Sequence, residues 1–95
     1  MRGDYKTPGG KLVTVDFDVN GGHLRNVRVT GDFFLYPEEA LEDIRAALEG
    51  LPTSETTEGI IARIDRALPE GAEMVGFSPE AVAIAVERGL GRDDT

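Results

Sequence analysis

Residues 11–30, KLVTVDFDVNGGHLRNVRVT, carry the pattern that decides the fold. Over residues 11–19 apolar and polar side chains alternate, which is typical of a strand with one buried face. The side chains expected on that buried face are Val13, Val15, Phe17 and Val19. The next three residues, Asn20-Gly21-Gly22, tolerate positive φ and therefore favour a tight hairpin turn.

The second half of this hairpin, residues 23–30, predicts a strand that returns antiparallel to the first. Val27 and Val29 have the spacing of inward-facing residues. Leu24 is out of phase with them, so we expect either a β-bulge or a partly covered outer face at this point. Ahead of the hairpin, residues 1–8 are polar, and we expect them to be extended.

Amphipathic helices are predicted after the hairpin, each delimited by capping residues and helix breakers. Their expected limits are Pro37 to Gly50, one of the cap candidates Thr53–Thr57 to Pro69, and Ser78 to Gly89. Residues 72–77 predict a short strand or an ordered connection. A hairpin followed by helices is typical of an α+β fold, here an antiparallel hairpin or three-stranded sheet covered on one face by about three helices. The length of 95 residues suits one domain, residues 1–95.

The first of these helices is expected to hold Pro37 in its first turn, where the missing N–H costs nothing. It is also strongly acidic, and we interpret its carboxylates as a solvated face. These residues are Glu38, Glu39, Glu42, Asp43 and Glu49. A docking role for the helix stays open.

The composition excludes several function classes. Acidic residues outnumber basic ones 18 to 10 and the net charge is -8, which argues against nucleic-acid binding because phosphate neutralisation needs clustered Lys and Arg. The chain has no cysteine, so it can form no disulfide, thiol nucleophile or zinc–thiolate site. It also has no apolar run of roughly 20 residues, the length that crosses a bilayer. We therefore expect a soluble cytoplasmic protein without membrane contact.

Candidate catalytic and metal-binding residues are sparse. Asp16, Asp18 and Asp32 could form a carboxylate cluster, but acids on the polar side of a strand are usually solvated. His23 lies in a turn without a nucleophile or orienting acid in any known spacing. Gly9-Gly10-Lys11 leads into a strand and not into a helix N-terminus, so it reads as a turn, although Lys11 could reach an anion across an interface. A binding or accessory role is favoured over catalysis.

The aromatic segment that follows the hairpin is the strongest binding candidate. Gly31-Asp32 predicts a turn, and Phe33-Phe34-Leu35 a short apolar extension. Because side chains alternate along an extended chain, Phe33 and Phe34 cannot both enter the same core. One should fill the core, and the other should face a second layer, a groove or a partner. Tyr36 adds a third aromatic, a residue type enriched at interfaces.

The run KTPGGKLVTVDFDV, together with HLRNVRVTGDFFLYPEEAL, resembles the C-terminal accessory domain of lipoate–protein ligases. The similarity is densest from Lys6 to Leu48, and Gly76-Phe77-Ser78-Pro79-Glu80 is similar to the family's closing turn and last helix. In this family the domain is either fused behind a catalytic domain or made as a separate protein. Since Met1 stands just ahead of the similar region, the chain resembles the separate form.

The resemblance implies a non-catalytic accessory subunit of a split, heterodimeric ligase. Its catalytic partner would bind ATP, Mg²⁺ and lipoate, form lipoyl-AMP and transfer lipoyl to a lysine of an acceptor domain. This chain would bind no cofactor and would order active-site loops and exclude water. No position matches a family catalytic residue. The expected interface residues are Lys11, Gly31, Asp32, Phe33, Phe34 and Tyr36.

Two other functions stay open at this point. One is a generic protein-binding adaptor for another acyltransferase of the biotin/lipoate-ligase fold. The other is a small independent enzyme that uses Asp32 or His23.

Overall fold

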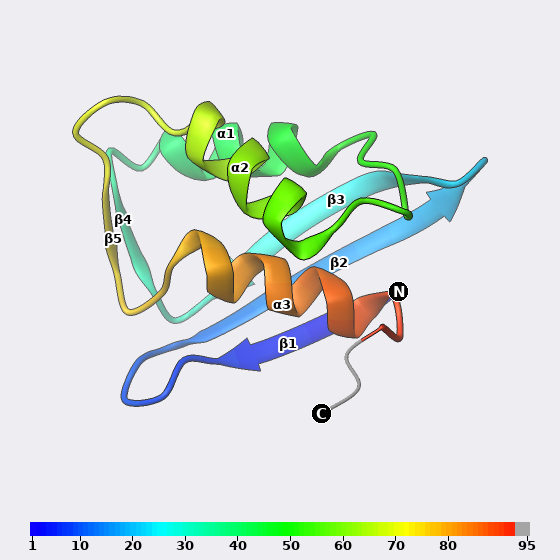
Figure 1. Ribbon diagram of the computed structural model, residues 1–95. Helices are drawn as coiled ribbons and strands as arrows, with labels where there is room; N and C mark the ends of the chain where they lie inside the picture. Colours follow the sequence, from blue (N-terminus) through cyan, green and yellow to red (C-terminus); the bar gives the residue numbers. More distant parts are fainter. Residues whose placement is uncertain (93–95) are drawn as a thin grey trace.

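The computed structural model describes residues 1–92 and places five strands and three helices along the chain (Figure 1). In chain order these are β1 (Arg2–Lys6), β2 (Leu12–Asn20), β3 (His23–Gly31), β4 (Phe34–Tyr36), α1 (Ala40–Leu48), α2 (Thr57–Ala67), β5 (Glu73–Val75) and α3 (Pro79–Gly89). The predicted hairpin is β2–β3, and the predicted caps of α2 and α3 are Thr56 and Ser78.

The main sheet is antiparallel and three-stranded, with β2 between β1 and β3. Its centre is marked by Val15, which pairs with Gly3 of β1 on one side and with Val29 of β3 on the other. The predicted three-stranded antiparallel sheet is therefore confirmed. The first strand comes from the polar segment for which the sequence predicted only an extended conformation.

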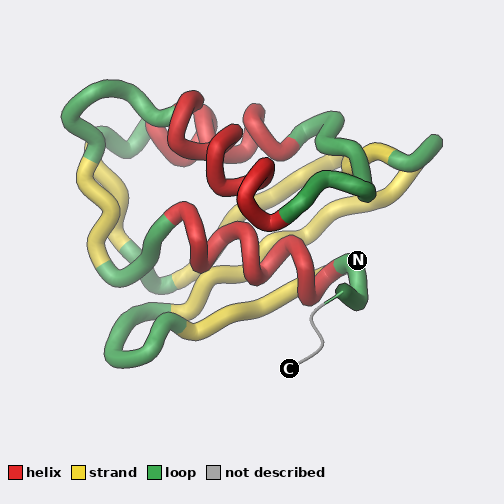
Figure 2. Tube along the Cα trace, viewed as in Figure 1, coloured by secondary structure: helices red, strands yellow, loops and turns green. Residues whose placement is uncertain are grey.

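The three helices lie on one face of this sheet, as the tube in Figure 2 and the ribbon in Figure 1 show. α1 packs against β3, α3 packs against β1 and β2, and α2 packs against the other two helices. The core between the layers is apolar, and its largest fully buried side chains are Leu24, Ile44, Leu48, Leu51, Ile60, Ile64, Val13, Val15, Val82 and Val86. The predicted α+β class is confirmed.

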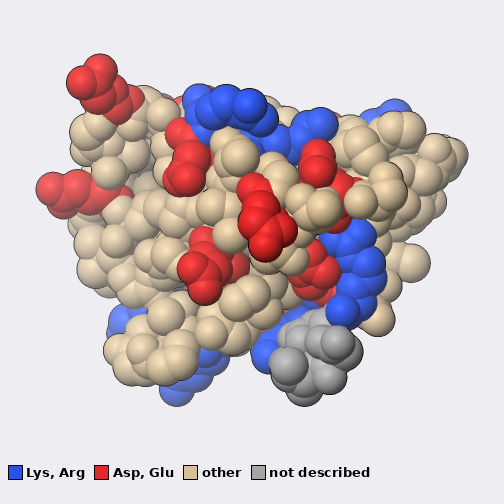
Figure 3. Space-filling view, viewed as in Figure 1, with Lys and Arg blue, Asp and Glu red and all other residues tan. Residues whose placement is uncertain are grey.

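The charged side chains on the helical side of the molecule are of mixed sign. Figure 3 shows acidic groups between basic ones over the face that carries α2 and α3. On the sheet, Asp16 pairs in register with Arg2 of β1 and with Arg28 of β3, so opposite charges face each other across the strands there as well. The net charge of -8 is thus spread over the surface shown and not gathered into one acidic patch there.

A β-bulge in β3 explains the position of Leu24. Asp16 pairs with Arg28 but Asp18 pairs with Arg25, so β3 carries one extra residue between these pairs. Asn26, within the bulge, has a φ of 55°, a left-handed conformation that Asn tolerates. The extra residue brings Leu24 onto the buried face with the inward valines of β3, which confirms the bulge that the sequence predicted as one of two possibilities.

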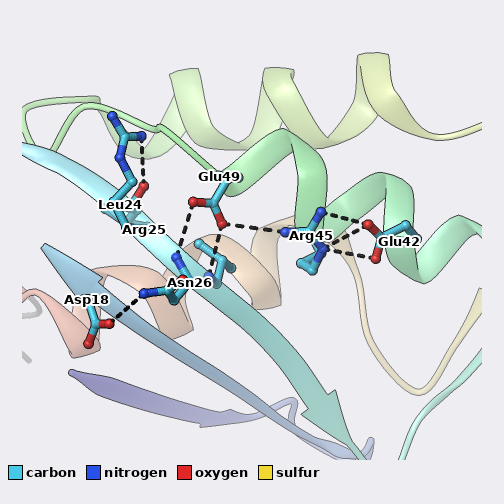
Figure 4. Close-up of polar contacts among 8 residues, drawn as sticks. Asp18, Leu24, Arg25, Asn26, Glu42, Arg45 and Glu49 are labelled. Carbon is cyan, nitrogen blue, oxygen red and sulfur yellow. Dashed lines mark hydrogen bonds and ion pairs between the residues drawn. The ribbon is translucent and has the colours of Figure 1, made fainter. Parts of the chain in front are cut away.

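The bulge is held by a carboxylate from α1, as Figure 4 shows. The two oxygens of Glu49 accept the backbone N–H groups of Asn26 and Val27, each at 3.1 Å. Arg45, one turn earlier on α1, donates to the same carboxylate at 3.4 Å. The interpretation of Glu49 as a solvated helix charge is therefore wrong, because this side chain joins the end of α1 to the exposed edge of β3.

Two further expectations from the sequence need correction. The first helix begins at Ala40, not at Pro37, because the Ala40 N–H donates to the Pro37 carbonyl at 3.0 Å and closes a four-residue turn, residues 37–40, that leads into the helix. Val19 was expected to be buried but is 39% exposed. It pairs with Leu24 near the tip of the hairpin, which extends past the helices in Figure 1.

Candidate partner-binding face

The segment after β3 forms a second, two-stranded antiparallel sheet with a residue stretch from much later in the chain. In this sheet β4 pairs with β5, and Phe34 lies opposite Val75 while Tyr36 lies opposite Glu73. Because directly paired residues share a face, these four side chains lie on the same side of the ribbon. We call this surface, formed by Phe34, Tyr36, Glu73 and Val75, the β4–β5 face.

Three of the four side chains on the β4–β5 face are large hydrophobic residues that are open to solvent. Phe34 is 56% exposed, Tyr36 52% and Val75 48%. Leu35, on the opposite side of the ribbon, is buried. Large exposed apolar side chains that cluster on one surface are typical of protein-binding sites, and aromatic residues are the preferred anchors there.

Phe33 has a different role from its neighbour Phe34. Its ring stacks on Phe77, with the ring centroids 3.9 Å apart and an angle of 22° between the planes. It is partly buried and packs against the main core. The expectation that the two phenylalanines face different surroundings is confirmed, and Phe34 is the one that remains available to a partner.

The other predicted interface residues lie at the junctions that support this ribbon. A Cβ on Gly31 would lie 2.2 Å from the Leu12 carbonyl oxygen and 2.8 Å from the Phe33 ring, so only glycine fits there. Asp32 is exposed, and its N–H donates to the same carbonyl at 3.2 Å. Lys11 is exposed as well, and its N–H donates to the carbonyl of Gly76 at 2.9 Å.

Five of the six predicted residues lie at the end of β3, in β4 or between the two strands, and Lys11 contacts Gly76 next to β5, so all six are near the two-stranded sheet labelled β4 and β5 in Figure 1. The structure also adds Glu73 and Val75, which the sequence did not single out. Their segment was predicted as a strand or a connection, and no local signal indicated that it pairs with β4. A groove of about 320 Å³ adjoins the ribbon and is lined by Phe33, Phe34, Leu35, Tyr36, Glu38 and Leu41.

Two of the residues considered for catalysis or metal binding, His23 and Asp18, make local contacts within the β2–β3 hairpin. The His23 ring Nδ1 lies 2.9 Å from the carbonyl of Gly21 in its own turn. Asp18 accepts a hydrogen bond from the Asn26 side chain at 2.9 Å. Within residues 1–92, no three His, Cys, Asp or Glu side chains are grouped as a metal ion would require.

Two carboxyl groups with lowered pKa values, Asp4 and Glu42, serve local structure. The Thr14 hydroxyl donates to Asp4 at 2.6 Å and lowers the pKa of that carboxyl, with a smaller contribution from Arg2. On α1, the hydrogen bonds from Arg45 lower the pKa of Glu42. Both shifts favour the ionised form, whereas a general acid at neutral pH needs a raised pKa.

No helix in the described part of the chain has the length and apolar character needed to span a membrane.

A family described as the C-terminus of bacterial lipoate protein ligases matches residues 2–68. The chain therefore belongs to the lipoate–protein ligase C-terminal family.

Two relatives from Thermoplasma acidophilum are similar to this chain. One is the lipoate-protein ligase A subunit 2, which is 31% identical over 39 residues; that match covers 41% of this chain and only 42% of the relative. The other is a chain in a solved structure described as a bi-partite lipoate protein ligase and its E2 lipoyl domain. It superimposes with a TM-score of 0.68 and 25% sequence identity, over 90% of this chain and 97% of that one.

Proposed function

We propose that this chain is the non-catalytic accessory subunit of a split lipoate–protein ligase. It would act in the cytoplasm and support ATP-dependent adenylation of lipoate by a separate catalytic subunit, which then transfers lipoyl to a lysine of an acceptor domain. ATP, Mg²⁺ and lipoate would bind to the catalytic subunit. Family membership and the similarity to one subunit of a bi-partite ligase support this proposal.

The observation that carries the proposal is the β4–β5 face. An accessory subunit needs a surface for its partner, and here Phe34 and Tyr36 are more than half exposed on a strand that pairs with β5. The ribbon is anchored from behind by the Phe33–Phe77 stack. Binding at this face would let the chain order loops of the catalytic subunit and keep water from a reactive acyl-adenylate.

The test is lipoyl-adenylate formation by the catalytic subunit from the same genome, with and without this chain. We expect activity to rise strongly on mixing. The Phe34→Ala and Tyr36→Ala variants should raise the concentration of this chain needed for half-maximal activity by about tenfold or more, as is typical for aromatic anchors at interfaces.

Val19→Ala is the matched control, because Val19 is also an exposed apolar side chain but lies near the tip of the β2–β3 hairpin. It should leave the activity unchanged. Full activity of the catalytic subunit alone, with no complex on gel filtration, would contradict the proposal and favour an adaptor for another partner.

A further inference from the structure

The mixed charges that Figure 3 shows over α2 and α3 are not repeated around the β4–β5 face. The strands β4 and β5, with the three residues on either side of each, span residues 31–39 and 70–78 and contain no Lys, Arg or His. The rest of the chain holds 13 acidic and 10 basic residues and is nearly balanced. The two segments therefore carry most of the excess negative charge, on Asp32, Glu38, Glu39, Glu70 and Glu73.

These five carboxylates are available to a partner. All five residues are exposed, and none of them forms an ion pair with any residue among 1–92. By contrast, Glu42 on α1 is paired with Arg45 at 2.6 Å. Glu73 lies directly opposite Tyr36 on the β4–β5 face, and Glu38 lines the groove of about 320 Å³ beside that face. Unpaired negative charge thus surrounds the exposed aromatic side chains.

Basic side chains offset this charge only in part. Lys11 is exposed, and its N–H donates to the carbonyl of Gly76 next to β5, so it places one positive charge near the five negative ones. Glu38 also lines a second hollow, of about 400 Å³ along α1, in which Arg28 and Arg45 supply positive charge. The negative excess is therefore greatest at the β4–β5 face and is offset along α1.

We propose that the catalytic subunit of the split ligase binds the β4–β5 face with an apolar surface that is surrounded by Lys and Arg side chains. Phe34, Tyr36 and Val75 form the apolar centre of this interface, and the five carboxylates form its charged rim. In such an interface the buried aromatic anchors set the lifetime of the complex, and the rim charges raise the association rate. The inference rests on the proposed function and adds the chemistry of the partner surface.

A second copy of this chain is a poorer occupant of the face. A two-fold interface places the same patch of both copies in contact, so the five carboxylates of one copy would face those of the other. Two chains of net charge -8 would also repel each other at low salt. A basic partner surface has neither disadvantage.

The test measures the association and dissociation rate constants of this chain with its catalytic subunit, by surface plasmon resonance at low and high salt. At low salt the double variant Glu70→Lys with Glu73→Lys should lower the association rate constant by about tenfold or more, because rim charges steer the encounter. Its dissociation rate constant should change by less than about threefold. At high salt the variant and the wild-type chain should associate at similar rates, because salt screens exposed charges.

The matched control is the double variant Glu58→Lys with Asp65→Lys, which reverses two exposed charges on α2. It changes the net charge of the chain by the same amount as the rim variant, but both positions lie outside residues 31–39 and 70–78. It should lower the association rate constant by less than about threefold. The comparison separates the effect of the rim from the effect of net charge.

The apolar centre should respond in the other rate constant. Phe34→Ala removes an aromatic side chain that is 56% exposed in the free chain, and it should raise the dissociation rate constant by about tenfold or more. Its association rate constant and the salt dependence of that constant should stay close to those of the wild-type chain. Thermal melting of each variant, followed by circular dichroism, establishes that it is folded.

The outcomes are distinguishable. If the wild-type chain forms no complex with the catalytic subunit, the proposed function fails and the inference fails with it. If a complex forms but the rim variant associates as fast as the α2 control, the accessory role stands and the inference is overturned. If the chain alone forms a dimer that Phe34→Ala abolishes, a second copy occupies the face, which also overturns the inference.

Discussion

The link between Glu49 and the bulge of β3 allows a quantitative prediction. Replacing Glu49 with alanine removes the acceptor of two backbone N–H groups at once. It leaves the α1 helix intact, because Glu49 is its C-cap residue and not an interior residue. The perturbation therefore tests one contact between a helix end and a strand edge.

The expected loss follows from the surroundings of the two N–H groups. Val27 is only 3% exposed, so water can hardly replace the carboxylate there, and a hydrogen bond to a charged group contributes about 1.5–3 kcal/mol. Asn26 is exposed, so water can accept its N–H in place of the carboxylate and recover much of the free energy of that hydrogen bond. Because the Glu49 side chain is itself 34% exposed, we expect a value in the lower half of this range, a loss of about 2 kcal/mol in the free energy of unfolding.

Urea and thermal unfolding followed by circular dichroism measure this loss. For a domain of this size, about 2 kcal/mol lowers Tm by roughly 8–16 °C. Glu49→Gln, which keeps one oxygen as acceptor, should give an intermediate value. Glu42→Ala is the matched control, since it removes only the exposed pair with Arg45. If Glu49→Ala destabilises no more than Glu42→Ala, the carboxylate does not hold the bulge and the reasoning is refuted.

Three further predictions concern stability. Gly3→Ala should destabilise by about 3 kcal/mol in urea unfolding, because the new Cβ would lie 1.7 Å from the carbonyl oxygen of Ala85 in α3; a wild-type midpoint would contradict this packing. Phe33→Ala should cost about 2 kcal/mol, measured in the same way, because it removes both the ring stack and the contact of Phe33 with the core, and an unchanged midpoint would show that neither contributes. Asp4→Asn should destabilise at neutral pH but not in acid. The Thr14 hydrogen bond lowers the folded pKa of Asp4 below its ordinary value of 3.8, so its stabilisation is present above that value and is lost as the pH falls through the folded pKa. A difference between wild type and variant that persists in strong acid would exclude this linkage.

The parts of the fold that the sequence predicted correctly depend on short-range signals. The β2–β3 hairpin is indicated by the Asn20-Gly21-Gly22 turn and by the alternation on either side of it. Thr56 and Ser78 cap their helices by accepting N–H groups three residues ahead, at 3.0 and 3.1 Å. Each of these signals lies within a few residues of the structure it determines, so it can be read without the rest of the chain.

The candidate site was predictable only in part, and for a related reason. Alternation indicated that Phe33 and Phe34 face different surroundings, but not which of them is exposed. Which phenylalanine is exposed is decided by Phe77, whose ring stacks on Phe33, and by β5, which pairs with β4. The Glu73 and Val75 side chains join the face only through this pairing, which no local pattern specifies.

From its residues alone, the chain is determined to be an α+β domain with an aromatic segment at the end of its hairpin and no recognisable catalytic motif, because strand alternation, turns and caps are properties of neighbours in sequence. The tertiary structure alone decides which aromatic side chains are exposed, that Glu49 binds the bulge of β3, and that Glu73 and Val75 share a face with Phe34 and Tyr36. These features depend on contacts between segments far apart in the chain, whose energies are set by packing and by which backbone groups find a partner.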